Sequence, residues 1–162
     1  MEERPRFLVD RNVGRLGKWL RALGYDVLLA PDLADGDLVD LARREGRVLL
    51  TRDRRIFHRR AVASGQVRAL LLHSERTWDQ LEEVVSILGL DLSRAFTRCL
   101  VCNEETHPAR PEEVRERVPP YVLRTQREFR ACPRCGRVYW KGTHWRNMLT
   151  ELRRCGAYPP AG

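Results

Sequence analysis

The sequence predicts an α/β fold with a mostly parallel sheet, followed by a small C-terminal metal-binding module. Short apolar segments alternate with amphipathic segments from residue 7 to residue 89, which is typical of βαβ units. Beyond residue 98 the chain is rich in arginine and proline and contains two Cys-x-x-Cys pairs. We therefore predict one domain over residues 1–92 and a second over residues 97–155.

The first strand and helix follow from the spacing of apolar residues. Residues 7–9 predict a short buried strand that ends at Asp10. Leucine and tryptophan then recur at helical spacing over residues 13–24, and the glycine at the end of this segment is placed to end the helix. Residues 25–30 (YDVLLA) are mostly apolar and predict the second strand.

The middle of the unit repeats this order. Residues 36–45 predict a helix that Gly46 ends, and residues 47–51 predict a third strand. A basic helix is expected over residues 54–63, directly after the third strand.

The remaining elements complete the sheet and the module. Residues 67–72 predict a fourth strand and residues 77–89 a further helix, with a hinge expected over residues 91–98. In the module, prolines between the two cysteine pairs indicate a loop or insertion. Residues 137–140 then predict a short strand and residues 145–154 a terminal helix.

The four paired cysteines predict a structural zinc site. Cys99 and Cys102 form one pair, and Cys132 and Cys135 form the other. Two such pairs can bring four thiolates to one tetrahedral Zn²⁺, with Zn–S distances of about 2.3 Å. Four thiolate ligands leave no open coordination position, so we expect this Zn²⁺ to stabilise the fold and any catalytic groups to lie before Cys99.

The charge of the chain favours a polyanionic partner. Its formal net charge is +8, and only Lys18 and Lys141 are lysines, so nearly all the positive charge is guanidinium. Arginine binds phosphate bidentately and stacks on bases, although a GC-rich genome or adaptation to heat also enriches arginine. No apolar run approaches the ~20 residues that a membrane span requires, and the N-terminus lacks the apolar region of a signal peptide. We expect a cytoplasmic protein that does not contact a membrane.

Acidic side chains follow the predicted strands and make candidate catalytic residues. Asp10 ends the first strand and Asp53 follows the third, while Asp35 and Asp37 open the second helix on the same edge of the sheet. Ligands of open parallel sheets bind beyond the carboxyl ends of the strands. A cluster of oxygen ligands suits Mg²⁺ or Mn²⁺, and one or two such ions can support phosphodiester hydrolysis.

Each acid also has a purely local interpretation. Asp35 could be a helix N-cap, and Asp37 a first-turn charge that the helix dipole favours. Asp53 could cap the helix that follows it or pair with a neighbouring arginine, and Asp10 could close an Asx turn. The agreement of their positions favours a joint function over four separate local roles.

Two polar residues are auxiliary candidates. Asn12 could hold a metal-bound water or the Asp10 carboxylate, or it could be the N-cap of the first helix. Thr51 could orient Asp53 through its hydroxyl, or it could belong only to the strand.

Basic and aromatic residues supply candidate RNA contacts. Cations beside the acidic edge could guide an RNA backbone, and tryptophans among cations in the module could stack on bases. A solvated helix face explains the first group nearly as well, and a small apolar core could explain the second. The candidates are Arg52, Arg54, Arg55, Trp140, Lys141 and Trp145.

Three segments together resemble one known family. They are FLVDRNVGRLGKWLRALGYDV, then DGDLVDLARREGRVLLTRD, then the cysteine pairs with CGRVYWKGTHWRNM. This ordered combination resembles the Mut-seven C-terminal RNase family, in which a PIN-like nuclease domain is fused to a zinc ribbon. The resemblance implies a three-layer PIN-like domain and a metal-dependent ribonuclease.

The resemblance also assigns roles by position. Asp10, Asp35 and Asp53 match the acids of the family, with Asp37 as a nearby second acid, and the four paired cysteines match its zinc ligands. Many PIN-like domains carry another acid just after the position of Asp53, where this chain has arginines. This departure could weaken a second metal ion.

These observations together predict a metal-dependent ribonuclease acting on single-stranded RNA. Mg²⁺ or Mn²⁺ would be held by Asp10, Asp35 and Asp53, helped by Asp37, and the zinc ribbon would position RNA. The main alternative is a non-catalytic adaptor that binds RNA or the ribosome and has a degenerate PIN-like site. A toxin-like nuclease with a partner antitoxin and a DNA-directed nuclease are further alternatives.

Overall fold

The computed structural model describes residues 3–161, so the first two residues of the predicted N-terminal domain lie outside the described residues. Its α/β unit contains a parallel four-stranded sheet with the strand order β2-β1-β3-β4. The strands are β1 (Phe7–Val9), β2 (Val27–Leu29), β3 (Val48–Thr51) and β4 (Ala69–Leu71). The predicted parallel sheet is confirmed.

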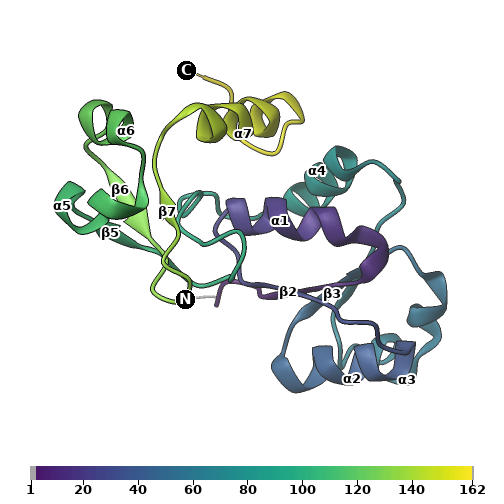
Figure 1. The fold of residues 1–162 in the computed structure, drawn as a ribbon. Helices are drawn as coiled ribbons and strands as arrows, with labels where there is room; N and C mark the ends of the chain where they lie inside the picture. Colours follow the sequence, from purple (N-terminus) through teal and green to yellow (C-terminus); the bar gives the residue numbers. More distant parts are fainter. Residues whose placement is uncertain (1–2, 162) are drawn as a thin grey trace.

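Helices cover both faces of this sheet, giving three layers (Figure 1). On one face lie α1 (Gly14–Ala22), preceded by the 3₁₀ turn η1 (Arg11–Val13), and α4 (Thr77–Leu88). On the other lie α2 (Asp35–Glu45) and α3 (Arg60–Ala63). The side chains of β1 alternate between two apolar cores: Phe7 and Val9 pack towards α1, and Leu8 packs towards α2.

The prediction of one continuous basic helix over residues 54–63 is wrong. The segment forms the 3₁₀ turn η2 (Arg54–His58) and then α3, because Arg59 between them has an extended backbone (φ −65°, ψ 134°). The break places η2 against the end of β3, and Ile56 is fully buried there.

The C-terminal part contains a second, antiparallel sheet with the order β5-β6-β7. Its strands are β5 (His107–Ala109), β6 (Phe129–Ala131) and β7 (Val138–Tyr139). The expected loop between the cysteine pairs is instead partly helical, with α5 (Pro111–Val114), η3 (Arg115–Arg117) and α6 (Pro120–Thr125). The prolines begin helices here, since proline is favoured at the first helical position. We call residues 97–142 the cysteine module.

The connecting segment of residues 91–98 packs tightly against the end of α1. The Tyr25 hydroxyl donates a hydrogen bond to the Asp91 carbonyl at 2.7 Å, and the Phe96 amide donates one to the Ala22 carbonyl at 2.6 Å. A Cβ atom at Gly24 would lie 2.1 Å from the Arg94 carbonyl oxygen, so only glycine permits this approach. The expected hinge is thus a docked segment.

The terminal helix α7 (Thr143–Arg154) returns from the cysteine module to the α/β unit (Figure 1). Leu152 is fully buried in the core that α1 and α4 share, and Ala157 joins the same core. None of the helices formed by residues 3–161 is both long and apolar enough to cross a membrane.

Candidate active site and metal centre

The sheet has a topological switch point between β1 and β3. The chain passes from β1 to β2 on one side and then crosses to β3 on the other. In open α/β sheets a ligand crevice forms at such a point, beyond the carboxyl ends of the strands. Asp10 directly follows β1, and Thr51 is the last residue of β3, so two of the predicted site residues lie at this point.

Thr51 joins the two strand ends. Its hydroxyl donates a hydrogen bond to Oδ2 of Asp10 at 2.7 Å and accepts one from the Asp53 amide at 3.0 Å. Thr51 is fully buried, so this hydroxyl is held in one position. Asn12 adds a second link, because its Oδ1 accepts a hydrogen bond from the Arg52 amide at 3.3 Å. Thr51 and Asn12 therefore position the groups around Asp10 and Asp53.

Asp53 is held by a bidentate arginine. Nε and Nη2 of Arg55 donate hydrogen bonds to the two carboxylate oxygens at 3.1 and 3.0 Å, and the Arg55 amide donates one to Oδ1 at 2.9 Å. The guanidinium hydrogen bonds lower the pKa of Asp53 below its ordinary value, so this carboxylate stays ionised. The Arg55 side chain is 82% exposed and is free to turn into solvent.

Asp35 and Asp37 lie in the first turn of α2, and the cap of that helix is Ala34, so the interpretation of Asp35 as the N-cap is wrong. Asp35 is half-buried, and its charge contributes to raising the pKa of Arg55, after the larger effect of Asp53. Asp35 therefore lies within electrostatic range of the Asp53–Arg55 pair. Asp37 is exposed.

The carboxylates also have local roles. Asp10 caps η1 by accepting a hydrogen bond from the Arg11 amide at 2.7 Å, and Asp53 caps η2. They do not converge on one point: among residues 3–161, only the four paired cysteines form a group of three or more potential ligands with all ligand atoms within 4.8 Å of one another. The carboxylates of Asp10 and Asp53 have different side-chain donors, Thr51 for Asp10 and Arg55 for Asp53.

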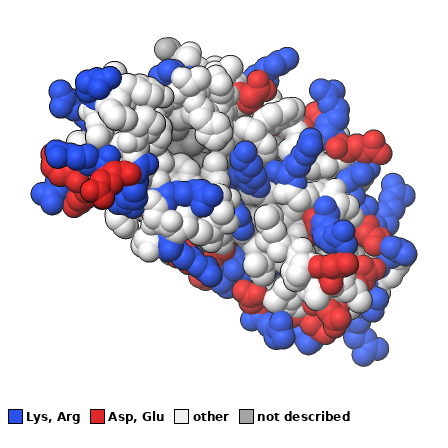
Figure 2. All heavy atoms as spheres, viewed as in Figure 1, with Lys and Arg blue, Asp and Glu red and all other residues white. Residues whose placement is uncertain are grey.

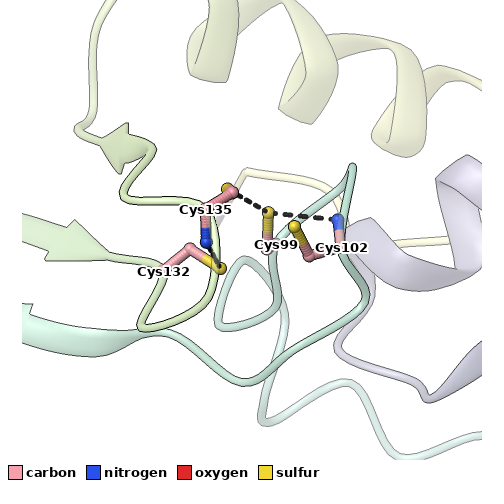
Figure 3. A group of neighbouring side chains, drawn as sticks. All are labelled: Cys99, Cys102, Cys132 and Cys135. Carbon is pink, nitrogen blue, oxygen red and sulfur yellow. Dashed lines mark hydrogen bonds between the residues drawn. The ribbon is translucent and has the colours of Figure 1, made fainter.

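The four cysteines form a closed site (Figure 3). Cys99 and Cys102 come from the loop before β5, and Cys132 and Cys135 from the loop between β6 and β7. The Sγ atoms of Cys99 and Cys135 lie 3.8 Å apart. Tetrahedral geometry at a Zn–S distance of about 2.3 Å places thiolates roughly 3.8 Å apart. The donor set and its spacing therefore fit Zn²⁺.

The two cysteine loops share one backbone turn. In each, the amide of the second cysteine donates a hydrogen bond to the first sulfur: Cys102 to Cys99 at 3.4 Å and Cys135 to Cys132 at 3.5 Å. The next residue has a left-handed backbone in both loops, with φ 68° at Asn103 and 75° at Gly136. Glycine and asparagine are the residues that adopt this conformation most readily.

Hydrogen bonds shift the pKa values of two thiols in the cluster in opposite directions. The Arg137 amide lowers the pKa of Cys135 to about 6, and the hydrogen bond with Cys135 raises the pKa of Cys102 to about 12. The Tyr139 hydroxyl lies 3.1 Å from the sulfur of Cys99 and accepts a hydrogen bond from the Leu100 amide at 3.2 Å. Tyr139 thus connects β7 to the first cysteine loop.

The first cysteine loop is docked on the α/β unit through Asn103, a contact that the sequence alone did not indicate. Nδ2 of Asn103 donates a hydrogen bond to Asp26 at 2.7 Å, and its Oδ1 accepts one from the Val27 amide at 2.9 Å. Arg47 pairs with the same Asp26 oxygen at 2.8 Å. Burial opposes the charge of Asp26, but these two hydrogen bonds outweigh it and lower its pKa. Asp26 is therefore part of the docking contact.

The candidate RNA contacts fall into two separate groups. Arg52, Arg54 and Arg55 lie at the end of β3, where Arg52 forms an ion pair with Glu75 at 3.6 Å. Trp140, Lys141 and Trp145 instead line a cleft whose wall includes Ala22, the last residue of α1. Since Asp10 precedes α1, the two groups lie at opposite ends of this helix.

The fold and its two clusters define a mixed α/β protein with a polar site at the switch point of a parallel sheet and a closed four-cysteine centre. The family model described as the Mut7-C RNAse domain matches residues 5–152, nearly the whole chain. The chain belongs to this family, which confirms the resemblance and indicates a ribonuclease-type function. No curated protein and no solved structure matches the chain.

Proposed function

We propose that this protein is a cytoplasmic, metal-dependent ribonuclease that hydrolyses RNA phosphodiester bonds at the β1–β3 edge of a PIN-like domain. The observation that carries the proposal is the link from Asp10 through Thr51 to Asp53 at the switch point, in a chain of an RNAse family. The proposal keeps the division into an α/β domain over residues 1–92 and a zinc ribbon module over residues 97–155.

The residues of this edge fit a hard divalent cation. Asp10, Asp35 and Asp53 offer only oxygen ligands, which suits Mg²⁺ or Mn²⁺. The donors that now hold Asp10 and Asp53 do not prevent binding: each oxygen of Asp10 accepts one hydrogen bond, from Arg11 or Thr51, and keeps a second lone pair, and the exposed Arg55 can leave Asp53. When bound, the cation activates water and stabilises negative charge on the phosphate. Asp37 lies two residues after Asp35 in the first turn of α2 and supports the site by its charge.

The neighbouring residues of this chain position the reacting groups. Thr51 fixes the carboxylate of Asp10, and Asn12 fixes the backbone that leads from β3 to Asp53. Arg52 and Arg54 offer guanidinium groups to the phosphates on either side of the bond that is cut. Zn²⁺ at the four cysteines stabilises the module and takes no part in the reaction.

Cleavage of 5′-labelled single-stranded RNA tests the proposal. Wild-type protein is assayed with and without Mn²⁺, its zinc content being measured in both conditions. Asp53→Asn keeps the size of the side chain and its capping oxygen but removes the charge, so cleavage is expected to fall at least 100-fold. Asp40→Asn is the matched control, since Asp40 lies on α2 and pairs with Arg43. Full activity of Asp53→Asn would exclude this site.

Two observations favour the adaptor as a second candidate. The acids do not converge in this structure, and the guanidinium of Arg55 is hydrogen-bonded to the Asp53 carboxylate that would bind the cation. An adaptor would bind RNA with an affinity that depends strongly on salt, and added Mn²⁺ would not cause it to cleave the RNA. Tight RNA binding without cleavage by either the wild type or Asp53→Asn would establish that function instead.

A further inference from the structure

A cleft of about 800 Å³ lies between the cysteine module and α7. Its walls come from β6 and β7, from the connecting segment and from the first turn and inner face of α7. On the face drawn in Figure 2, the surface between the module and α7 is hollowed and mostly uncharged, with basic side chains beside it. This volume is typical of sites that take small organic ligands or nucleotides.

Aromatic residues make up a third of the lining of this cleft. The ring of Phe96 lies 5.4 Å from that of Trp145, and Phe129 lies 6.4 Å from Trp140. Trp140 and Trp145 are only partly buried, so part of each indole is open to solvent. Exposed aromatic faces are the surfaces on which unpaired bases stack, whatever their sequence.

Phe96 reaches the cleft through an unusual backbone. Its φ is 63°, in the left-handed region that bulky residues rarely adopt, and its amide is held by the Ala22 carbonyl. An asparagine or glycine would suit this conformation better. Phe96 is therefore an aromatic residue at a position whose backbone conformation does not by itself favour one.

The charge of the lining suits a polyanion. Arg98, Arg130 and Lys141 face a single acid, Glu128, which gives the lining a net charge of +2 by 3 − 1. The two guanidinium groups are committed to backbone carbonyls, Arg98 to Asn103 and Arg130 to Thr106. Lys141 is the most exposed of these cations, at 61%: its Nζ lies 5.6 Å from the centre of the Trp145 ring and 3.7 Å from the Glu128 carboxylate.

We propose that this cleft binds unpaired bases of single-stranded RNA, with Trp140 and Trp145 stacking on the bases and Lys141 contacting a phosphate. The inference rests on the proposed function in taking RNA as the ligand. It adds a binding site separated from the acidic edge by the length of α1, about 13 Å for nine residues.

A basic surface joins the two sites. Arg15 and Lys18 are exposed and lie three residues apart, on one face of α1 between Asp10 and the buried Ala22 at the cleft. They line a second hollow with Arg76, Glu75 and the tilted pair Trp19 and Trp78, whose ring centroids lie 4.5 Å apart. An RNA strand that fills the cleft can therefore follow α1 to Asp10.

Fluorescence anisotropy of a labelled 12-nucleotide oligouridylate tests the cleft. The zinc-bound protein carries Asp53→Asn so that the RNA stays intact. Trp145→Leu is expected to weaken binding at least fivefold, because one base loses its stacking partner, while Trp145→Phe keeps an aromatic face and stays within twofold of the parent. A blunt RNA duplex of the same length, whose bases are not available, is expected to bind at least tenfold more weakly.

A charge-matched pair of variants covers the case in which Trp145→Leu fails to fold. Lys141→Glu and Arg134→Glu change the net charge equally, but Arg134 is 69% exposed on the second cysteine loop and does not line the cleft. Lys141→Glu is expected to weaken RNA binding at least threefold more than Arg134→Glu. Equal effects of these two variants in folded, zinc-loaded protein would overturn the proposal.

The outcomes separate the cleft from the catalytic site. If the cleft variants lose RNA binding and the wild-type protein does not cleave RNA with Mn²⁺, the cleft is an RNA-binding site but the proposed nuclease function is wrong. If cleavage requires Asp53 but is unchanged by Trp145→Leu and Lys141→Glu at RNA concentrations below the Kd, the nuclease function holds and the proposed RNA site in the cleft is wrong. If the cleft variants bind RNA as the parent does but lose binding of a basic or acidic test peptide, the site is a peptide site and the proposal is wrong.

Discussion

Arg55 places its guanidinium on both oxygens of Asp53, where it competes with any cation that this carboxylate would bind. Arg55→Ala removes the competitor and leaves the capping hydrogen bond of the main chain. We expect the affinity for Mn²⁺ to rise by about two- to fivefold, the range of an exposed ion pair. Electron paramagnetic resonance of free Mn²⁺ measures this directly. Arg54→Ala, at the exposed neighbouring position, is the control, and an unchanged affinity in Arg55→Ala would show that the pair does not limit metal binding.

The pair of Asp53 and Arg55 is expected to make the stability of the fold depend on pH. Arg55 lowers the pKa of Asp53 in the folded protein, so the pair stabilises the fold at pH values above the ordinary carboxylate range. This contribution is lost as the pH falls through the lowered pKa. In Arg55→Ala the carboxyl carbon of Asp53, followed by NMR, is expected to titrate at a higher pH than in the wild type. Titration of the two proteins at the same pH would contradict the assigned cause.

Several residue roles depend on contacts that no sequence pattern encodes. Asp10 and Asp53 could be identified from their positions after strands, but the contact of Thr51 with Asp10 spans 41 residues. The contact of Asp26 with Asn103 spans 77 residues. An asparagine directly after a Cys-x-x-Cys pair was the one local signal that could have indicated this contact, since the turn needs a left-handed residue there.

At the scale of elements, Asn103 has two roles that can be tested separately: its side chain hydrogen-bonds the first cysteine loop to Asp26 and β2, and its backbone takes the left-handed conformation that the loop needs. Asn103→Gly keeps the left-handed backbone and removes both side-chain hydrogen bonds, so we expect a loss of about 2 kcal/mol in the free energy of unfolding. Asn103→Ala adds the cost of a left-handed alanine, about 1 kcal/mol more. Urea denaturation of zinc-saturated protein checks both values. An alanine variant as stable as the glycine variant would contradict the backbone part of this account.

The four-cysteine centre is expected to be required for folding of the module, because its own apolar core is small. Cys132→Ser is expected to lose the zinc that the wild type binds, one ion per chain, and to become poorly soluble. Cys155→Ser is the matched control, since Cys155 follows α7 and lies outside the cluster. Zinc content by mass spectrometry and recovery in the soluble fraction measure the effect. A folded Cys132→Ser protein with one zinc ion would refute a structural role.

The elements of the α/β unit were more predictable than those of the module. Apolar periodicity located all four strands and three of the four expected helices, because buried strands and amphipathic helices leave a local pattern. The basic segment after β3 carries no such pattern, and the extended backbone of Arg59 divides it. In the module, helices of four to six residues are too short for a periodic signal, and proline was compatible with either a loop or a helix start.

Across the whole molecule, the acidic edge and the aromatic cleft lie at the two ends of α1, which predicts a dependence on RNA length. Chains too short to span roughly 13 Å reach only one site. We expect the Kd of oligouridylates to fall steeply as the chain grows until both sites are filled, and then to change little. Each phosphate neutralised adds about 0.7 to the slope of log K against log salt for a single strand. Affinity that does not depend on length would contradict a continuous binding surface.

The central claim is that the carboxylates at the β1–β3 switch point hold a cation for RNA cleavage. The most direct measurement is the rate of cleavage of labelled single-stranded RNA as Mn²⁺ is titrated into wild-type protein and into Asp10→Asn, with zinc content constant. The account predicts that cleavage by the wild type rises with Mn²⁺ and saturates, while Asp10→Asn stays at least 100-fold slower at every concentration. Equal Mn²⁺-dependent cleavage by both proteins, or cleavage by neither, would contradict it.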